Sequence, residues 1–254
     1  MKRFILLLGL IFAAAVTASA AKFVEREFTC PVCGHSFYAK LDVGDAPHDI
    51  RLDLKPIGDV PAPWLLPDCP ACGFIIYSIN IPKAELARAR AITASEDYKK
   101  NLQRSSYFRL GLLYAGLDKP PFVVANAFLR AAWQEENDPI KIKEDLGFTL
   151  KYFTACAKDE KSAVEERENS QLLMGELLRR LGRFEEATAH LKGLQGIKGF
   201  QNNFFADVVA YELKLSSEKD AAIYEMEDVR SFKRPLLDQL KWQVKKLMRK
   251  YNKE

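Results

Sequence analysis

Two short stretches, Cys30-Pro31-Val32-Cys33-Gly34 and Cys69-Pro70-Ala71-Cys72-Gly73, share the pattern C-P-x-C-G. We call each a knuckle. A tetrahedral Zn²⁺ ion binds four thiolates at about 2.3 Å, and a C-x-x-C turn brings two of them to one ion. The proline favours the first φ of such a turn, and the final glycine accepts the positive φ that closes it. The pattern predicts one structural zinc ion per chain, bound by Cys30, Cys33, Cys69 and Cys72.

The residues around the knuckles have the pattern of short strands. Side chains alternate from Val24 to Phe28 and from Ser36 to Leu41, and Phe74 to Ile79 is an apolar, strand-like run. We therefore expect each knuckle at a strand turn, in a zinc-ribbon-like β module over residues 21–82. Such a small unit buries little surface, so the metal would hold it together.

Two other uses of the cysteines remain open. An exported protein can form structural disulfides, and a C-x-x-C pair can exchange disulfides when its first cysteine begins a helix. The residues after Cys33, Gly34 to Phe37, lack helical character. Covalent haem is disfavoured because Gly34 displaces His35 from the C-x-x-C-H position. The fifth cysteine, Cys156, lies in a helical pattern and is expected to be a small buried residue.

The N-terminus has the features of a secretory signal peptide over residues 1–20. Lys2 and Arg3 precede an apolar run from Phe4 to Val16, and Ala18-Ser19-Ala20 is a small-x-small cleavage sequence. We expect export to the periplasm or the extracellular space after cleavage. The alternative is an uncleaved N-terminal membrane anchor.

From Lys83 onward the apolar period becomes helical, which predicts a mainly α fold. Asp138 before Pro139 indicates a helix start, and Ser217 with Asp220 resembles a capping box. We expect helices over residues 83–93, 95–116, 120–136, 139–157, 160–182, 184–195, 200–215, 218–227 and 235–251.

Residues 83–229 are predicted to form a tetratricopeptide-like helical domain, because parts of this range have the spacing of that repeat. Between Gln171 and Leu194, Gly175 precedes Ala187 by twelve residues, as that repeat requires. Gly111 marks a similar first helix, and Gly147 marks a degraded middle copy. Small residues at these positions let paired helices approach closely. A non-repeating helical bundle is the alternative.

The last 25 residues, 230–254, are strongly basic, with nine Lys or Arg residues and two acidic ones. Pro235 can begin a helix whose apolar stripe caps the array. Lys241, Lys245 and Arg249 are spaced four apart on another face, and Trp242 lies off the stripe. These four residues are candidates for contact with an anionic surface or an acidic partner.

In its two knuckles and the helical region that follows them, the chain resembles the bacterial domain-of-unknown-function family 2225. The matching stretches are Phe28 to Gly34, Asp68 to Phe74 and Ser106 to Leu110. The resemblance implies a metal site in a chain with two C-P-x-C-G knuckles followed by a tetratricopeptide-like region. It implies no known activity.

The composition is that of an ordinary globular protein, with 48% hydrophobic and 28% charged residues, which excludes a disordered, collagen-like or multispanning membrane protein. The net charge of +4 is too small to indicate nucleic-acid binding. The chain lacks the phosphate-loop, nucleophile-elbow and dinucleotide-binding motifs. We therefore expect a protein-binding scaffold or adaptor of the cell envelope rather than an enzyme. The alternative is an envelope thiol–disulfide protein that uses the C-x-x-C pairs.

Overall fold

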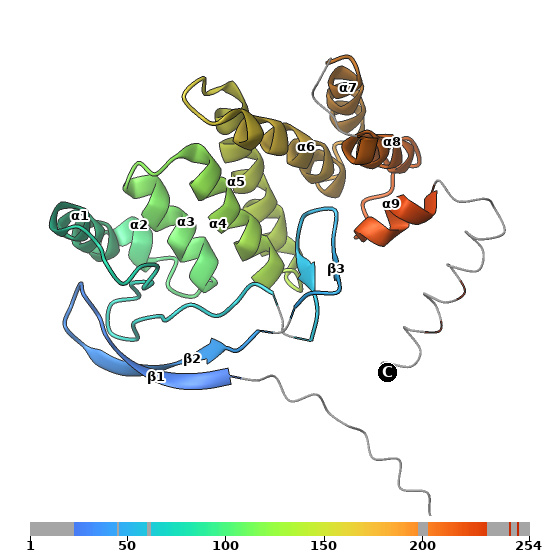
Figure 1. Ribbon diagram of the computed structural model, residues 1–254. Coiled ribbons are helices and arrows are strands. Elements are labelled where there is room, and N and C mark those ends of the chain that lie inside the picture. Colours follow the sequence, from blue (N-terminus) through green and yellow to red (C-terminus); the bar gives the residue numbers. More distant parts are fainter. Residues whose placement is uncertain are drawn as a thin grey trace, which may run out of the picture.

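The computed structural model describes residues 23–44, 46–59, 62–197 and 203–232, together with Val244 and Met248. The predicted signal peptide lies outside these residues, as does nearly all of the helix expected over 235–251. The described part is mainly α, with nine helices and two small antiparallel sheets of two strands each (Figure 1). None of its helices combines the length and apolar character that crossing a membrane requires.

Both sheets lie in the N-terminal part of the chain. β1 (Phe23–Thr29) pairs with β2 (Ser36–Asp42), which confirms the first two predicted strands. β3 (Asp49–Ile50) pairs with β4 (Pro56–Ile57) in the segment between the knuckles. The strand expected over Phe74–Ile79 is wrong, because only Ile75 pairs there, in a single bridge with Asp68.

The helices follow in chain order, and most match their predicted ranges. Asp138 caps α5 as predicted, accepting hydrogen bonds from the N–H groups of Ile140 and Lys141. The helices are α1 (Lys83–Ala94), α2 (Glu96–Lys99), α3 (Ser106–Gly116), α4 (Pro121–Gln134), α5 (Pro139–Lys158), α6 (Val164–Arg180), α7 (Phe184–Gln195), α8 (Asn203–Ser217) and α9 (Met226–Phe232).

The single helix expected over 95–116 is wrong, since the chain breaks between α2 and α3. Glu135 explains the break. Its carboxylate accepts the N–H of Ser105 at 2.6 Å and pairs with the guanidinium of Arg104 at 2.8 Å. Ser105 then caps α3 by accepting the N–H of Phe108. These contacts with a residue distant in sequence outweigh the local helical pattern.

The helix expected over 218–227 is also wrong, and so is its capping box. α8 continues through Ser217, whose hydroxyl donates to the carbonyl oxygen of Lys214. Asp220 accepts the N–H of Ala222 and the hydroxyl of Tyr224, which holds a turn there. The next helix, α9, begins only at Met226.

From α3 to α9, each helix packs against the next one along the chain, and α6 also packs against α8. Figure 1 shows the resulting row of helices. One apolar cluster joins the knuckles to α1–α4, and another joins α4 to α5, α6 and α7. A third cluster joins α8 and α9 to Leu52 of the inter-knuckle segment.

Two of the three predicted small residues lie where helices approach closely. A Cβ atom on Gly175 of α6 would lie 2.4 Å from Leu191 Cδ2 on α7, and one on Gly111 of α3 would lie 2.7 Å from Phe128 Cε1 on α4. A Cβ atom on Gly147 of α5 would have no neighbour within 4 Å. Close approach is therefore confirmed at Gly111 and Gly175, and the expectation is wrong for Gly147.

This contrast predicts opposite effects for the same substitution. Gly175→Ala should lower the free energy of unfolding by about 1–3 kcal/mol, because the new methyl group overlaps Leu191. Gly147→Ala, the matched control, should raise it by about 0.5–1 kcal/mol by removing backbone freedom from a helix interior. Urea denaturation of both variants measures the difference. Equal effects would show that α6 and α7 are not in close contact at Gly175.

Candidate metal centre

The first knuckle forms the turn between β1 and β2. The N–H of Cys30 donates to the carbonyl oxygen of His35 at 2.9 Å, and the N–H of Gly34 donates back to the carbonyl oxygen of Cys30 at 2.8 Å. Gly34 has φ +76°, a left-handed conformation that favours glycine. The first knuckle therefore lies at a strand turn, as predicted.

The second knuckle repeats this geometry without regular strands on either side. The N–H of Cys69 donates to the carbonyl oxygen of Phe74 at 3.0 Å, and the N–H of Gly73 donates to that of Cys69 at 2.8 Å. Gly73 has φ +71°. The Asp68–Ile75 bridge flanks this turn. The C-P-x-C-G sequence thus forms the same turn in two different settings.

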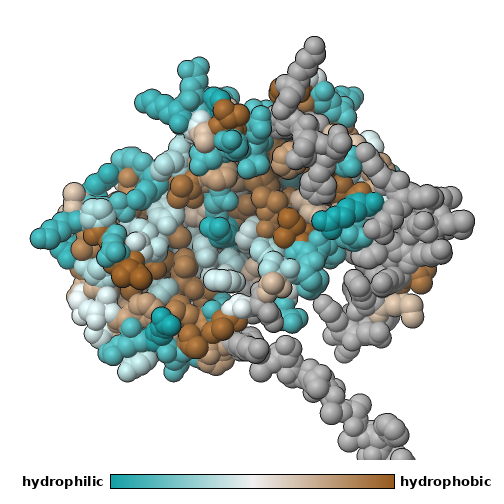
Figure 2. Space-filling view, in the orientation of Figure 1, coloured by the Kyte–Doolittle hydropathy of each residue, from teal (hydrophilic) through white to brown (hydrophobic). Residues whose placement is uncertain are grey.

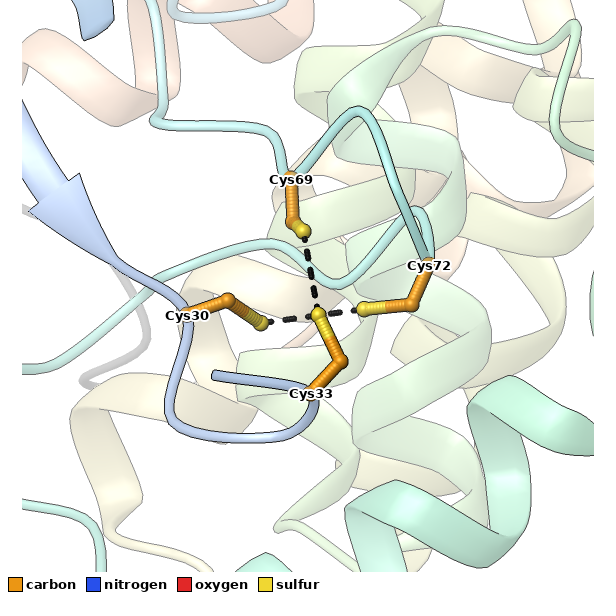
Figure 3. Close-up of side chains that lie close together, drawn as sticks. All are labelled: Cys30, Cys33, Cys69 and Cys72. Carbon is orange, nitrogen blue, oxygen red and sulfur yellow. Dashed lines mark hydrogen bonds between the residues drawn. The ribbon is translucent and has the colours of Figure 1, made fainter. Parts of the chain in front are cut away.

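The two knuckles face each other and bring their four thiols together (Figure 3). All four Sγ atoms lie within 4.8 Å of one another. The Sγ–Sγ distance is 3.7 Å for Cys30 and Cys72, and 3.6 Å for Cys33 and Cys69. A disulfide bond is only about 2.05 Å long, and all four cysteines are free. The four residues could hold a metal ion.

Burial raises the pKa of thiols in this cluster, and nearby backbone N–H groups lower it. Cys30 and Cys69 are buried, Cys72 is half-buried and Cys33 is exposed. Burial raises the pKa of the Cys30 thiol, although the N–H groups of Cys33 and Val32 partly oppose this. Burial also raises the pKa of Cys72. The N–H of His35 lowers the pKa of Cys33. A bound cation would stabilise all four thiolates and release their protons.

Arg109 of α3 fixes the second knuckle to the helices. Its Nη1 donates to Asp68 Oδ1 at 2.8 Å and to the carbonyl oxygen of Gly73 at 3.1 Å, and its Nη2 pairs with Asp68 Oδ2. The hydroxyl of Tyr98 donates to the same Gly73 oxygen at 2.9 Å. The contacts of Arg109 and Tyr98 with the knuckle were not predicted, because their spacing from it in the sequence carries no local signal.

A second arginine fixes the first knuckle. Arg90 Nε on α1 donates to the carbonyl oxygen of Val32 at 3.0 Å. Val32 and Cys30 belong to the same apolar cluster as Cys69 and Tyr98. Both knuckles are therefore held by helices α1–α3 as well as by each other.

The other candidate residues lie away from the four cysteines or outside the described part of the chain. Cys156 is fully buried in α5, which confirms its predicted place. Lys241, Trp242, Lys245 and Arg249 lie outside the described residues. Near them, Val244 and Met248 are helical and exposed. Among the described residues, the four knuckle cysteines are the only group of three or more His, Cys, Asp or Glu side chains placed to hold a metal ion.

The role of Arg109 gives a direct prediction. Arg109→Gln should weaken metal binding by about 10–100-fold, as the loss of a positioning contact around a metal site commonly does. Arg88→Gln is the control, because Arg88 pairs with Asp118 on the exposed surface. Competition with a chromophoric chelator measures both affinities. If Arg109→Gln binds metal as tightly as Arg88→Gln, Arg109 does not position the knuckle.

Comparison with known proteins yields no match to a family model, a curated protein or a solved structure. The resemblance stated above therefore stays a prediction.

Proposed function

We propose that the four cysteines bind one structural zinc ion per chain. In a tetrahedron with bonds of about 2.3 Å, neighbouring sulfurs lie about 3.8 Å apart, close to the 3.6 and 3.7 Å found across the knuckles. Four thiolates also leave no open coordination position for a substrate, which favours a structural ion over a catalytic one.

If zinc binds here, the mature protein isolated from its native compartment should contain it. We expect about one zinc per chain by elemental analysis, and no knuckle disulfide by mass spectrometry. Cys69→Ser should lose the metal and much of the thermal stability, because the knuckle supports the apolar cluster. Cys156→Ala, the control, should retain the metal since Cys156 lies outside the site. Metal-free, folded protein with disulfide-bonded knuckles would contradict the zinc assignment.

We further propose that the chain is an exported scaffold or adaptor that binds other proteins in the cell envelope. The observation that carries this proposal is the row of helices from α3 to α9, in which each helix packs on the next. Helices α3 and α4 approach closely at Gly111, and α6 and α7 do so at Gly175. Tetratricopeptide-like helix pairs stack in this way and offer an extended binding surface. Figure 2 shows hydrophobic side chains gathered over the middle of one face, bordered by hydrophilic ones, which supports an interaction surface.

Thiol–disulfide exchange is the weaker alternative. An exchange pair needs an accessible first cysteine, commonly at a helix N-terminus. Cys30 and Cys69, the first cysteines of the two pairs, are both buried, and each begins a tight turn rather than a helix. The arrangement therefore favours metal binding over exchange.

The basic C-terminal segment supplies a test of the scaffold proposal. We expect Lys241→Glu, Lys245→Glu and Arg249→Glu together to abolish salt-sensitive binding to anionic vesicles or to a co-purified acidic partner, with the melting temperature nearly unchanged. The control reverses three exposed lysines elsewhere, Lys83, Lys143 and Lys161. Absence of such binding by the wild type at low salt would leave this segment only the role of capping the helical array.

A further inference from the structure

The 35 residues between Cys33 and Cys69, 34–68, carry a second hairpin that contains none of the cysteines. We call residues 49–57 the clasp hairpin. It contains β3, β4 and the turn between them, in which the N–H of Arg51 donates to the carbonyl oxygen of Lys55 at 2.9 Å. Figure 1 shows it beside α6, α8 and α9. Its contacts fall into three groups: basic, apolar and acidic.

The basic contacts reach the end of α4. Glu136 accepts Arg51 Nη1 at 2.7 Å through one carboxylate oxygen and Lys55 Nζ at 2.7 Å through the other. Lys55 Nζ also lies 3.4 Å from the carbonyl oxygen of Trp133. Arg51 is buried and Glu136 is half-buried, and the two basic groups bind separate oxygens of one carboxylate, which makes the contact geometrically specific.

The apolar contact is made by Leu52, which is only 2% exposed. Its N–H donates to the carbonyl oxygen of Tyr224 at 2.9 Å, and Arg51 pairs with Glu225 in a β-bridge. The clasp hairpin thus extends along the α8–α9 connection in the manner of a bound peptide. The side chain of Leu52 packs in a cluster with Val208, Tyr211, Leu215, Met226 and Val229.

The acidic contact is made by Asp53, which is 2% exposed. It pairs with Arg51 within the hairpin at 2.5 Å and with Arg180 at the end of α6 at 3.4 Å. A basic residue, a leucine and an acidic residue in succession are therefore each matched by a complementary feature of the helices. We call the complementary set, Glu136, Arg180 and the Leu52 cluster, the clasp face.

We propose that the clasp face is a peptide-binding surface of this protein, that the clasp hairpin fills it as a built-in ligand, and that the four-cysteine site locks the hairpin in place. The partner is an extended protein segment in which a basic residue, a large aliphatic residue and an acidic residue follow one another. This inference rests on the proposed scaffold function and names the partner's chemistry.

The lock follows from the chain's connectivity. An ion bound by Cys33 and Cys69 ties together both ends of the inter-knuckle segment, so the clasp hairpin stays close to its face. Loss of the ion frees these ends and lets the hairpin leave the face more often. A partner's apparent affinity equals its intrinsic affinity multiplied by the fraction of molecules whose face is vacant. Metal loss increases that fraction, so it should raise the apparent affinity.

Binding of a synthetic peptide to the full-length chain tests the proposal. The probe is a fluorescent peptide of residues 48–58, and the control peptide carries Leu52→Asp. We expect the probe to bind at least tenfold more tightly after the metal is removed by a chelator with reductant present. The same gain is expected in a metal-loaded variant with Arg51→Ala and Lys55→Ala, whose hairpin is weakened while the knuckles stay intact. Glu136→Gln in that variant should weaken probe binding.

Two results would overturn the proposal. One is equal probe affinity in the wild type and the Arg51→Ala, Lys55→Ala variant, with helical content retained. The other is loss of helical content without probe binding, both in that variant and after chelation, which would make the hairpin part of the folding core. Either result would leave the scaffold proposal standing if charge reversal of the C-terminal segment still removes its partner, so the two failures are distinguishable.

Discussion

Four thiols from two turns that are far apart in the sequence converge in the N-terminal part of this protein. β1 is exposed along most of its length, and a hairpin with so little buried surface is barely stable in water. The facing knuckles connect this region to the helices, because they share one apolar cluster with α1–α4. A cross-link that closes a loop of this size removes unfolded-state entropy equivalent to about 4 kcal/mol. One metal ion bound across the knuckles would have a comparable effect.

The knuckles are also joined to the helices through a short chain of polar contacts. Arg109 holds Asp68 and Gly73 beside the second knuckle, and its Nε donates to the carbonyl oxygen of Arg104. Arg104 in turn pairs with Glu135 at the end of α4. Breaking a buried ion pair by removing one partner is strongly destabilising, because the other charge remains without compensation. The position of the second knuckle is thus determined by contacts that extend to α4.

Glu135 and Glu136, two adjacent residues at the end of α4, each hold a different part of the N-terminal region. Glu135 supports the turn just before α3, the helix that carries Arg109, and Glu136 binds the clasp hairpin. Together they help to position the second knuckle and the clasp hairpin, which lies in the middle of the segment that follows Cys33. This arrangement explains how a long, irregular segment with several prolines takes a defined path across the helices.

The sequence predicted the features that depend on local pattern. Both knuckles, the strands beside the first one and most helices follow from residue spacing. The break before Ser106 was missed because Glu135, thirty residues away, determines it. The turn at Asp220 and the path of Leu52 were missed because each helps to position the other through Tyr224. Arg109 was missed for the same reason, since its role appears only when α3 lies beside the second knuckle.

One metal ion bound by all four thiolates would fix the N-terminal region on the helices. X-ray absorption at the zinc edge of the metal-loaded, full-length protein measures how many sulfur atoms bind the ion. We expect four sulfur ligands at about 2.3 Å and no nitrogen or oxygen ligand. Fewer than four sulfur ligands, or nitrogen or oxygen in their place, would show that the four cysteines do not bind one ion together.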